Sequence, residues 1–359
     1  MAEIINVVEP TLDTEAGHCY SFISALCRAG DASRMLRLWV SRRVELAFAE
    51  KHIQIRKHFF RRIRRLQSYF LYRKLLAEPG KLFISTAGRT DLLLLDWASR
   101  EAIPEKKAYL YFHWFNANDK KLSSLKAIAH RQPNLVILGP TPSVVKIFHD
   151  AGFRGARVVP YPISRRDANF QAEPNQFRHL LYAGAARRDK GFSHVVDLVA
   201  HLQECGLQIP VLLQTSPEHY GKYDATTQAD IQRLQAIAYP YLRLCPETLD
   251  NRGYADIFVG AICLQLYDQS DFIDRVSGVT LDAFSAGCPT VATAGTWMAR
   301  MAQRFEAGVS VADLSAPQVL SAVERVMAEY ADYNRHALHA GKILQEENDA
   351  GTLFRVLAN

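Results

Sequence analysis

Residues 274–292 read Asp274-Arg-Val-Ser-Gly-Val-Thr-Leu-Asp282-Ala-Phe-Ser-Ala-Gly287-Cys-Pro289-Thr-Val-Ala292. A Ser-Gly turn precedes a mostly apolar helical run, and a Gly-Cys-Pro turn stops that run before a short β-like stretch. The stretch therefore predicts a loop, a helix and a strand. A loop that opens a helix presents free backbone N–H groups and the positive end of the helix dipole, which suits a phosphate. Asp282, further along the helix, could reach the paired hydroxyls of a ribose or a sugar.

A second loop with related chemistry occupies residues 184–191, Gly184-Ala-Ala-Arg187-Arg188-Asp189-Lys190-Gly191. It lies between a predicted strand at 180–183 and a predicted helix at 192–205. Small residues allow a ligand to approach the backbone closely, and fixed cations neutralise the charge of a diphosphate. A basic turn before an ordinary helix would have the same composition, so the loop alone leaves both interpretations open.

Together, the two loops resemble retaining nucleotide-sugar glycosyltransferases of the GT-B fold, family 4 (glycosyl transferases group 1) in particular. Residues 274–292 resemble the family's acid-x7-acid segment and its "EAMAxGxPVVA" run, and Lys190-Gly191 matches the "GR…KG" donor-phosphate loop. Aspartates replace both usual glutamates, and Ala185 or Ala186 stands where the loop arginine is usually found. Arg187 or Arg188 would then take the role of that arginine by a shifted path.

The resemblance implies a role for each of these residues. Arg187, Arg188 and Lys190 would neutralise the diphosphate, and the backbone of Ser277 and Gly278 would donate hydrogen bonds to it. Asp282 would hold the ribose, and Asp274 would orient the donor sugar. No metal and no further cofactor would be required, because cationic side chains would neutralise the leaving diphosphate.

Strands and helices alternate along the 359 residues, a length that suggests two domains. The expected strands lie at 4–8, 35–40, 81–86, 108–112, 135–138, 157–160, 180–183, 210–214, 242–245, 261–266 and 290–292. Such alternation favours α/β domains with parallel sheets and helices on both faces. We expect a first domain at 1–165 and a second at 166–337, connected near 160–178. The resemblance implies that they are Rossmann-like, face one another across a cleft, and are bridged by a final helix at about 338–359.

Ligand-contacting residues of a parallel sheet gather where its strands end. The loop after the first expected strand contains Gly17 and His18, and the strand at 108–112 ends in His113 and a polar cluster that includes Asn116. By position, the resemblance makes His113 a contact of the donor sugar or the acceptor, and it places Gly17, His18 and Asn116 on the acceptor side. A lone histidine is otherwise usually structural.

The basic charge of the chain is concentrated in residues 51–76, which hold nine Lys or Arg and no acid, whereas the remainder has 34 basic and 37 acidic residues. We interpret residues 51–74 as a helix whose apolar face is surrounded by cations, a pattern typical of helices in anionic membrane interfaces. The apolar face comprises Phe59, Ile63, Leu66 and Phe70, and the proposed membrane cations are Arg61, Arg62, Arg64 and Arg65. A helix packed on its own domain is the main alternative. A nucleic-acid surface is another, but no recognition motif accompanies the charge.

Composition places the chain among globular proteins, with 48% hydrophobic and 22% charged residues. Six scattered cysteines without a Cys-x-x-Cys pair predict reduced thiols. No apolar stretch reaches about 18 residues, so we expect a cytoplasmic protein, peripheral on the inner face of the cytoplasmic membrane.

The implied activity is transfer of a sugar from a nucleotide diphosphate sugar to a hydroxyl of a glycan or lipid-linked acceptor, with retention of configuration, in the synthesis of cell-surface polysaccharide or glycolipid. Two alternatives stay open. One is a nucleotide-sugar epimerase or hydrolase on the same fold. The other is a non-catalytic, membrane-associated scaffold with a decayed site.

Overall fold

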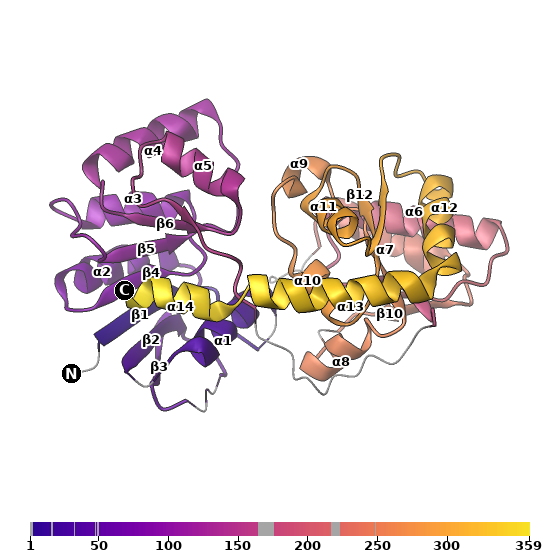
Figure 1. The fold of residues 1–359 in the computed structure, drawn as a ribbon, viewed down its shortest axis with the longest axis horizontal. Helices are drawn as coiled ribbons and strands as arrows, with labels where there is room; N and C mark the ends of the chain where they lie inside the picture. The colour runs from indigo at the N-terminus through magenta and orange to yellow at the C-terminus, as the bar shows by residue number, and fades with distance from the viewer. Residues whose placement is uncertain are drawn as a thin grey trace. The chain divides into compact units, whose positions relative to one another are not determined.

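The computed structural model describes residues 3–15, 17–31, 33–46, 48, 50–163, 176–216, 223–247 and 249–359. The chain forms two compact units (Figure 1). Unit 1 comprises Met1–Arg165 and Glu347–Asn359, and unit 2 comprises Arg166–Glu346. The connection expected at 160–178 falls largely on residues 164–175, which lie outside the described residues.

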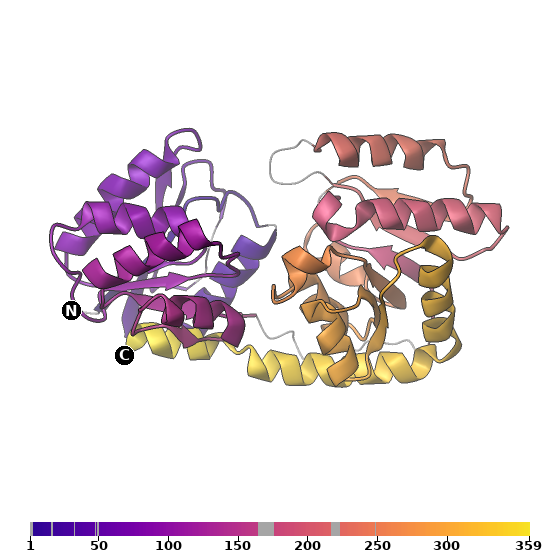
Figure 2. The ribbon, with the colours of Figure 1, turned by 90° about the horizontal axis from the view of Figure 1, so that it is seen from above.

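Unit 1 is built on a seven-stranded parallel sheet with the strand order β3-β2-β1-β4-β5-β6-β7. Its strands are β1 (Glu3–Glu9), β2 (Arg34–Ser41), β3 (Ile53–Phe59), β4 (Lys81–Ile84), β5 (Ala108–Tyr111), β6 (Val136–Gly139) and β7 (Arg157–Val158). Its helices are α1 (Gly17–Ala29), α2 (Arg64–Ala77), α3 (Arg89–Ala98), α4 (Asp119–Arg131), α5 (Pro142–Asp150) and α14 (Ala350–Ala358). Helices α2 to α5 cover one face of the sheet, and α1 packs with α14 on the other (Figures 1 and 2). The expected parallel sheet with helices on both faces is therefore confirmed.

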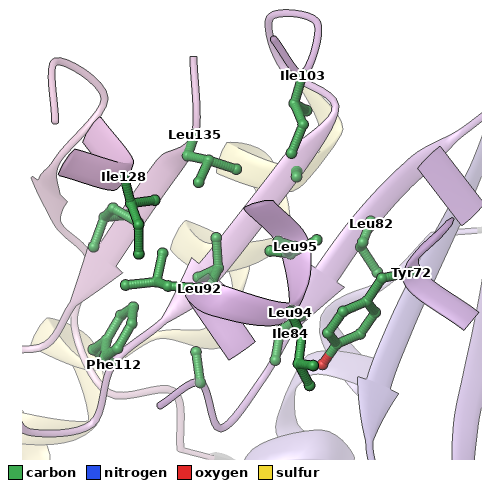
Figure 3. Close-up of a cluster of buried hydrophobic side chains, with 14 of the residues drawn as sticks. Tyr72, Leu82, Ile84, Leu92, Leu94, Leu95, Ile103, Phe112, Ile128 and Leu135 are labelled. Atoms are coloured by element: carbon green, nitrogen blue, oxygen red, sulfur yellow. The ribbon is translucent and has the colours of Figure 1, made fainter. Parts of the chain in front are cut away.

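The core under α2 to α5 explains why the central strands are so apolar. Every residue of β4, β5 and β6 is buried, as expected for strands covered on both faces. Their side chains meet apolar residues of the covering helices, among them Tyr72, Leu92 and Ile128 (Figure 3).

The single helix expected over residues 51–74 is wrong in its first half. Residues 53–59 form the edge strand β3, paired in parallel with β2, and the helix α2 begins only at Arg64. The alternation of Ile53 and Ile55 with polar residues is a strand pattern that the density of charge obscured. Phe59, expected on the exposed helix face, is 1% exposed at the end of β3.

Unit 2 repeats the architecture with six parallel strands in the order β10-β9-β8-β11-β12-β13. Its strands are β8 (His179–Tyr182), β9 (Val211–Gln214), β10 (Leu242–Cys245), β11 (Ala261–Gln265), β12 (Thr290–Thr293) and β13 (Gly308–Val311). Its helical segments are η1 (Arg188–Lys190), α6 (Phe192–Glu204), α7 (Ala225–Ala236), α8 (Asn251–Asp256), α9 (Gln269–Phe272), α10 (Gly278–Ser285), α11 (Trp297–Arg304), α12 (Ala316–Ala328) and α13 (Tyr330–Glu347). Helices α6, α7 and α12 share one apolar core, whereas α8 and α10 pack into another.

The last two helices, α13 and α14, pack in different units. In unit 2, α13 lies so close to α10 that a Cβ on Gly341 would stand 2.5 Å from the Phe284 carbonyl oxygen. In unit 1, α14 ends against two cations of the sheet. Lys81 Nζ donates to the Leu357 carbonyl at 3.0 Å, and Arg34 donates to the Ala358 carbonyl at 2.8 Å. Cations at a helix C-terminus satisfy its free carbonyls and complement its dipole, so they fix α14 to the sheet.

All six cysteines are free thiols, as expected, and four of them are buried while Cys205 is exposed. Within the described part of the chain, no helix has both the length and the apolar character that crossing a bilayer would require.

Candidate functional site

The two loops singled out in the sequence meet at the switch point of the unit 2 sheet. Strand β8 is central, with β9 on one side and β11 on the other, so the order of the chain reverses between β8 and β11. In open parallel sheets, ligands bind beyond the carboxyl ends of the strands at such a point. The loop of residues 183–191 follows β8, and the segment that leads to α10 follows β11.

The first loop folds back so that its lysine covers its glycine. Gly184 has φ of +94°, and its N–H donates to Gln214 Oε1 at 2.6 Å. A Cβ on Gly184 would lie 2.9 Å from Lys190 Nζ, so the ammonium group sits directly over this glycine. Lys190 Nζ also lies 5.7 Å from the centre of the Tyr267 ring, just beyond the end of β11. The lysine is therefore held at the switch point.

Gly191 fixes the same loop against the sheet. Its φ is +67°, and a Cβ here would come within 1.8 Å of the Leu266 carbonyl oxygen. No side chain fits at that separation. The lysine that precedes it is thereby anchored beside β11.

The arginines of this loop differ in their surroundings. Arg188 is exposed, whereas Arg187 is half-buried and pairs with Asp189 through two of its nitrogens, with Nε at 2.7 Å from Oδ1. A third cation, Arg275, approaches the same carboxylate, with 3.8 Å between Arg275 Nη1 and Asp189 Oδ2. Its guanidinium also lies over the Phe272 ring at 4.8 Å. The sequence patterns did not indicate Arg275, because its neighbours come from a distant loop.

The N-terminus of α10 opens beside these cations. The Ser277 hydroxyl caps the helix by accepting from the Thr280 N–H at 3.4 Å. A Cβ on Gly278 would meet no atom within 4 Å, so there is space in front of the first turn. The Val279 side chain would be 3.7 Å from a Cβ on Gly184, which places the helix start next to the first loop. An anion in this space would meet both backbone N–H groups and cations.

The two acidic residues of the motif occupy different positions. Asp282 lies within α10 and is half-buried. Burial raises the pKa of the Cys263 thiol on β11 to about 12, and the charges of both Lys190 and Asp282 act on this thiol, so both side chains lie in its neighbourhood. Asp274, before the helix, is tied to α11 instead, with 2.5 Å between its Oδ1 and Arg300 Nη2.

The residues expected on the acceptor side lie at the carboxyl edge of the unit 1 sheet. Gly17, with φ of +81°, begins α1, and the side chain of His18 is outside the described residues. His113 follows β5, and its Nε2 is 2.9 Å from the Ser85 carbonyl oxygen. Its ring packs 5.1 Å from those of Phe22 and Tyr111. Asn116 is exposed further along the same loop.

Sequence reasoning missed Glu9 at this edge. It is 1% exposed at the end of β1, and its carboxylate accepts from the hydroxyls of Thr11 at 2.6 Å, Ser85 at 2.7 Å and Thr86 at 2.5 Å. A buried carboxylate satisfied by three hydroxyls fixes the loops after β1 and β4 to one another. A glutamate at the end of an apolar strand, two residues before Thr11, was the available signal.

Comparison with known proteins places this architecture among glycosyltransferase structures. Sucrose-phosphate synthase from Thermosynechococcus elongatus matches with a TM-score of 0.69 at 15% identity, over 99% of this chain and 96% of that one. Anabaena HepE in complex with UDP-glucose matches with 0.69 at 13%, over 99% and 98%. WaaG, a glycosyltransferase involved in lipopolysaccharide biosynthesis, matches with 0.67 at 12%, over 94% and 95%. No protein-family model and no curated protein sequence matches the chain. The chain therefore has the GT-B fold.

Proposed function

We propose that the protein is a glycosyltransferase that moves a sugar from a nucleoside diphosphate sugar to a hydroxyl of a glycan or lipid-linked acceptor. The observation that carries the proposal is the meeting of Lys190, Arg187 and the open N-terminus of α10 at the switch point of unit 2. A diphosphate is the ligand whose charge suits such a site. The complex of HepE with UDP-glucose makes uracil the first base to test.

Each residue of the site has a proposed task. Lys190 and the arginines hold the diphosphate, and the first turn of α10, at Ser277 and Gly278, donates backbone hydrogen bonds to it. Asp282 binds the ribose hydroxyls. Asp274 orients the sugar, with its carboxylate direction set by Arg300. We propose that His113 of unit 1 contacts the donor sugar or the acceptor, and its ring is fixed by the Ser85 carbonyl and aromatic neighbours.

The reaction breaks the bond between the sugar's anomeric carbon and the leaving diphosphate oxygen and forms a bond from that carbon to the acceptor oxygen. The acceptor proton moves to the departing diphosphate, so that no separate base is consumed. Negative charge grows on the diphosphate as it leaves, and fixed cations stabilise it most at that moment. Because the departing diphosphate takes the acceptor proton, the acceptor attacks on the face that the diphosphate leaves, and we propose retention of configuration. Because fixed cations neutralise the diphosphate, we propose transfer without a metal cofactor.

Thermal unfolding with UDP, GDP, ADP, CMP, dTDP and their sugar conjugates tests the donor site. A ligand at 100 times its Kd stabilises the folded state by about 2.7 kcal/mol, so one nucleotide family should raise the Tm. Lys190→Ala and Asp282→Ala should abolish that rise, while Lys126→Ala on the exposed side of α4 should not. No rise with any nucleotide would favour the non-catalytic scaffold.

Turnover distinguishes the remaining alternative. Release of free sugar or an epimer without any acceptor would indicate the hydrolase or epimerase. NMR of the anomeric proton in the transfer product would decide retention, and activity that persists in EDTA would support metal independence.

We further propose that unit 1 binds an anionic membrane and so meets an acceptor presented there. Helix α2 faces the core with Ser68, Leu71, Tyr72 and Leu75, which leaves its other face uncovered. That face and the turn before it expose four large apolar residues to between 49% and 58%: Phe60, Ile63, Leu66 and Phe70. Helix α2 therefore packs on its own domain, as the main alternative expected, while these four residues, the membrane patch, stay exposed on its other side.

The charges around the membrane patch select an anionic partner. Arg61, Arg62 and Arg65 are exposed beside it, Arg64 is half-buried, and Arg42 lies over the Phe60 ring at 4.8 Å. Cations near an anionic surface contribute about 1 kcal/mol each. The apolar side chains can also insert into the membrane interface, and a nucleic acid offers no such apolar environment. We place the protein on the inner face of the cytoplasmic membrane.

Flotation with vesicles tests this surface. The wild-type protein should float with vesicles that contain phosphatidylglycerol. It should remain in the bottom fraction of the gradient with vesicles of phosphatidylcholine alone. Reversing the charges of Arg61, Arg62, Arg64 and Arg65 should abolish flotation, whereas the matched reversal of Arg100, Lys120, Lys126 and Arg154 should preserve it. Flotation of neither protein would refute the proposal, and binding to single-stranded DNA without flotation would favour the nucleic-acid alternative.

A further inference from the structure

A further arginine, Arg275, faces residues 184–191, the donor loop, from outside that loop. Arg275 lies in the segment between α9 and α10, yet its guanidinium reaches Asp189 of the first loop. The contact is supported by the backbone, because the Asp268 N–H donates to the Asp189 carbonyl at 2.9 Å. The two segments are thus joined at one carboxylate, with Arg187 on one side and Arg275 on the other.

The carboxylate is shared unequally between the two arginines. Arg187 engages both of its oxygens, whereas Arg275 Nη1 remains 3.8 Å away, beyond hydrogen-bond distance. Each arginine side chain is 24% exposed. Burial lowers the pKa of Arg275, and the charge of Arg187 adds to the effect, while Asp189 and Asp271 oppose it.

The aromatic side chains connect Arg275 to the lysine of the site. Its guanidinium lies over the Phe272 ring, which packs edge-on to the Tyr267 ring at 4.7 Å. The Lys190 ammonium group lies over the Tyr267 ring. Arg275 and Lys190 are thus held at two ends of one rigid aromatic pair. Arg275 also stands only two residues before Ser277, the N-cap of α10.

We propose that Arg275 is a diphosphate-binding residue of the donor site, supplied by the segment before α10 and positioned by Asp189 and Phe272. The inference rests on the proposed function and adds a residue to the same site. Three cations, Arg187, Lys190 and Arg275, then converge on the start of α10. A planar guanidinium can bind two phosphate oxygens at once, so this position suits a diphosphate better than a single carboxylate.

Binding measurements separate a ligand contact from a structural brace. The probes are UDP, uridine and inorganic pyrophosphate, measured by calorimetry with Arg275→Gln, Arg275→Lys and Arg325→Gln. Arg325 is exposed on α12 and provides the same charge change away from the site. Arg275→Gln should weaken UDP and pyrophosphate at least about tenfold and leave uridine unchanged. The affinity of Arg275→Lys for UDP and pyrophosphate should lie between those of Arg275→Gln and wild type.

Two results would overturn the inference. If the Arg275→Gln variant binds UDP and pyrophosphate as tightly as the Arg325→Gln variant does, Arg275 does not contact the diphosphate. Equal weakening of UDP and uridine would show that the arginine only braces the loops. Failure of the proposed function looks different, because the wild-type protein would then bind neither pyrophosphate nor any nucleoside diphosphate.

Discussion

Replacing Gly191 by alanine tests whether the donor loop depends on its contact with the sheet. Gly191 has φ of +67°, and its added Cβ would stand 1.8 Å from the Leu266 carbonyl oxygen. Gly206, after α6, is a matched control in the same unit. Its φ is +65°, and its added Cβ would meet nothing within 4 Å. The two substitutions share the backbone strain and differ in the clash.

The expected magnitudes follow from that difference. A non-glycine residue in the left-handed region costs roughly 1–2 kcal/mol, and this cost applies to both alanines. Overpacking adds about 1–3 kcal/mol at Gly191, because the carbonyl belongs to the end of a central strand. In a unit of this size, each kcal/mol lowers the Tm by about 2–4 °C. Gly191→Ala should therefore unfold about 2–12 °C below Gly206→Ala.

Calorimetric unfolding of both variants, with and without UDP, measures the effect. Gly191→Ala should also lose the stabilisation by nucleotide, since relief of the clash moves Lys190 away from Gly184. Gly206→Ala should keep it. Equal Tm values for the two variants, with nucleotide binding retained in both, would refute the reasoning that Gly191 anchors the loop.

Three further outcomes are expected. Gly278→Ala should leave the free energy of unfolding within about 0.5 kcal/mol of wild type, because its Cβ meets open space, yet reduce the rise in Tm that nucleotide causes. Lys81→Met should release α14 by removing the bond to the Leu357 carbonyl, seen as faster hydrogen exchange in residues 350–358, at a cost of about 1–3 kcal/mol. Burial lowers the pKa of His179, whose Nε2 meets the Ile257 carbonyl, so the unfolded state binds the proton more readily. Stability should fall as pH drops through the usual histidine value of 6.5, and His179→Gln should flatten that Tm profile.

The parts of the fold that the sequence predicted are those encoded by short, local patterns. The strand-helix alternation led to both parallel sheets, and the expected loop, helix and strand at 274–292 correspond to α10 and β12. Strand β3 was missed because its cations were given more weight than its alternation, and β13 because Gly308–Val311 is short and partly polar.

The candidate site was predictable only as far as one stretch of chain could show it. Lys190 and Gly191 stand together in a motif, and the structure adds the clash that makes the glycine necessary. Arg275 and Glu9 act through partners that are distant in sequence, so no local pattern marks them. The pairing of Asp274 with Arg300 of α11 likewise depends on tertiary folding.

The docking of α14 has a consequence for synthesis on the ribosome. Domains generally fold as they emerge, the N-terminal one first. Unit 1 cannot be completed in that order, because Ala350–Ala358 leaves the ribosome only after all of unit 2. Until then, Lys81 and the surface of α1 that receives α14 stay uncovered. The nascent chain therefore carries an incomplete first unit throughout translation of the second, and closure of unit 1 is its last folding step.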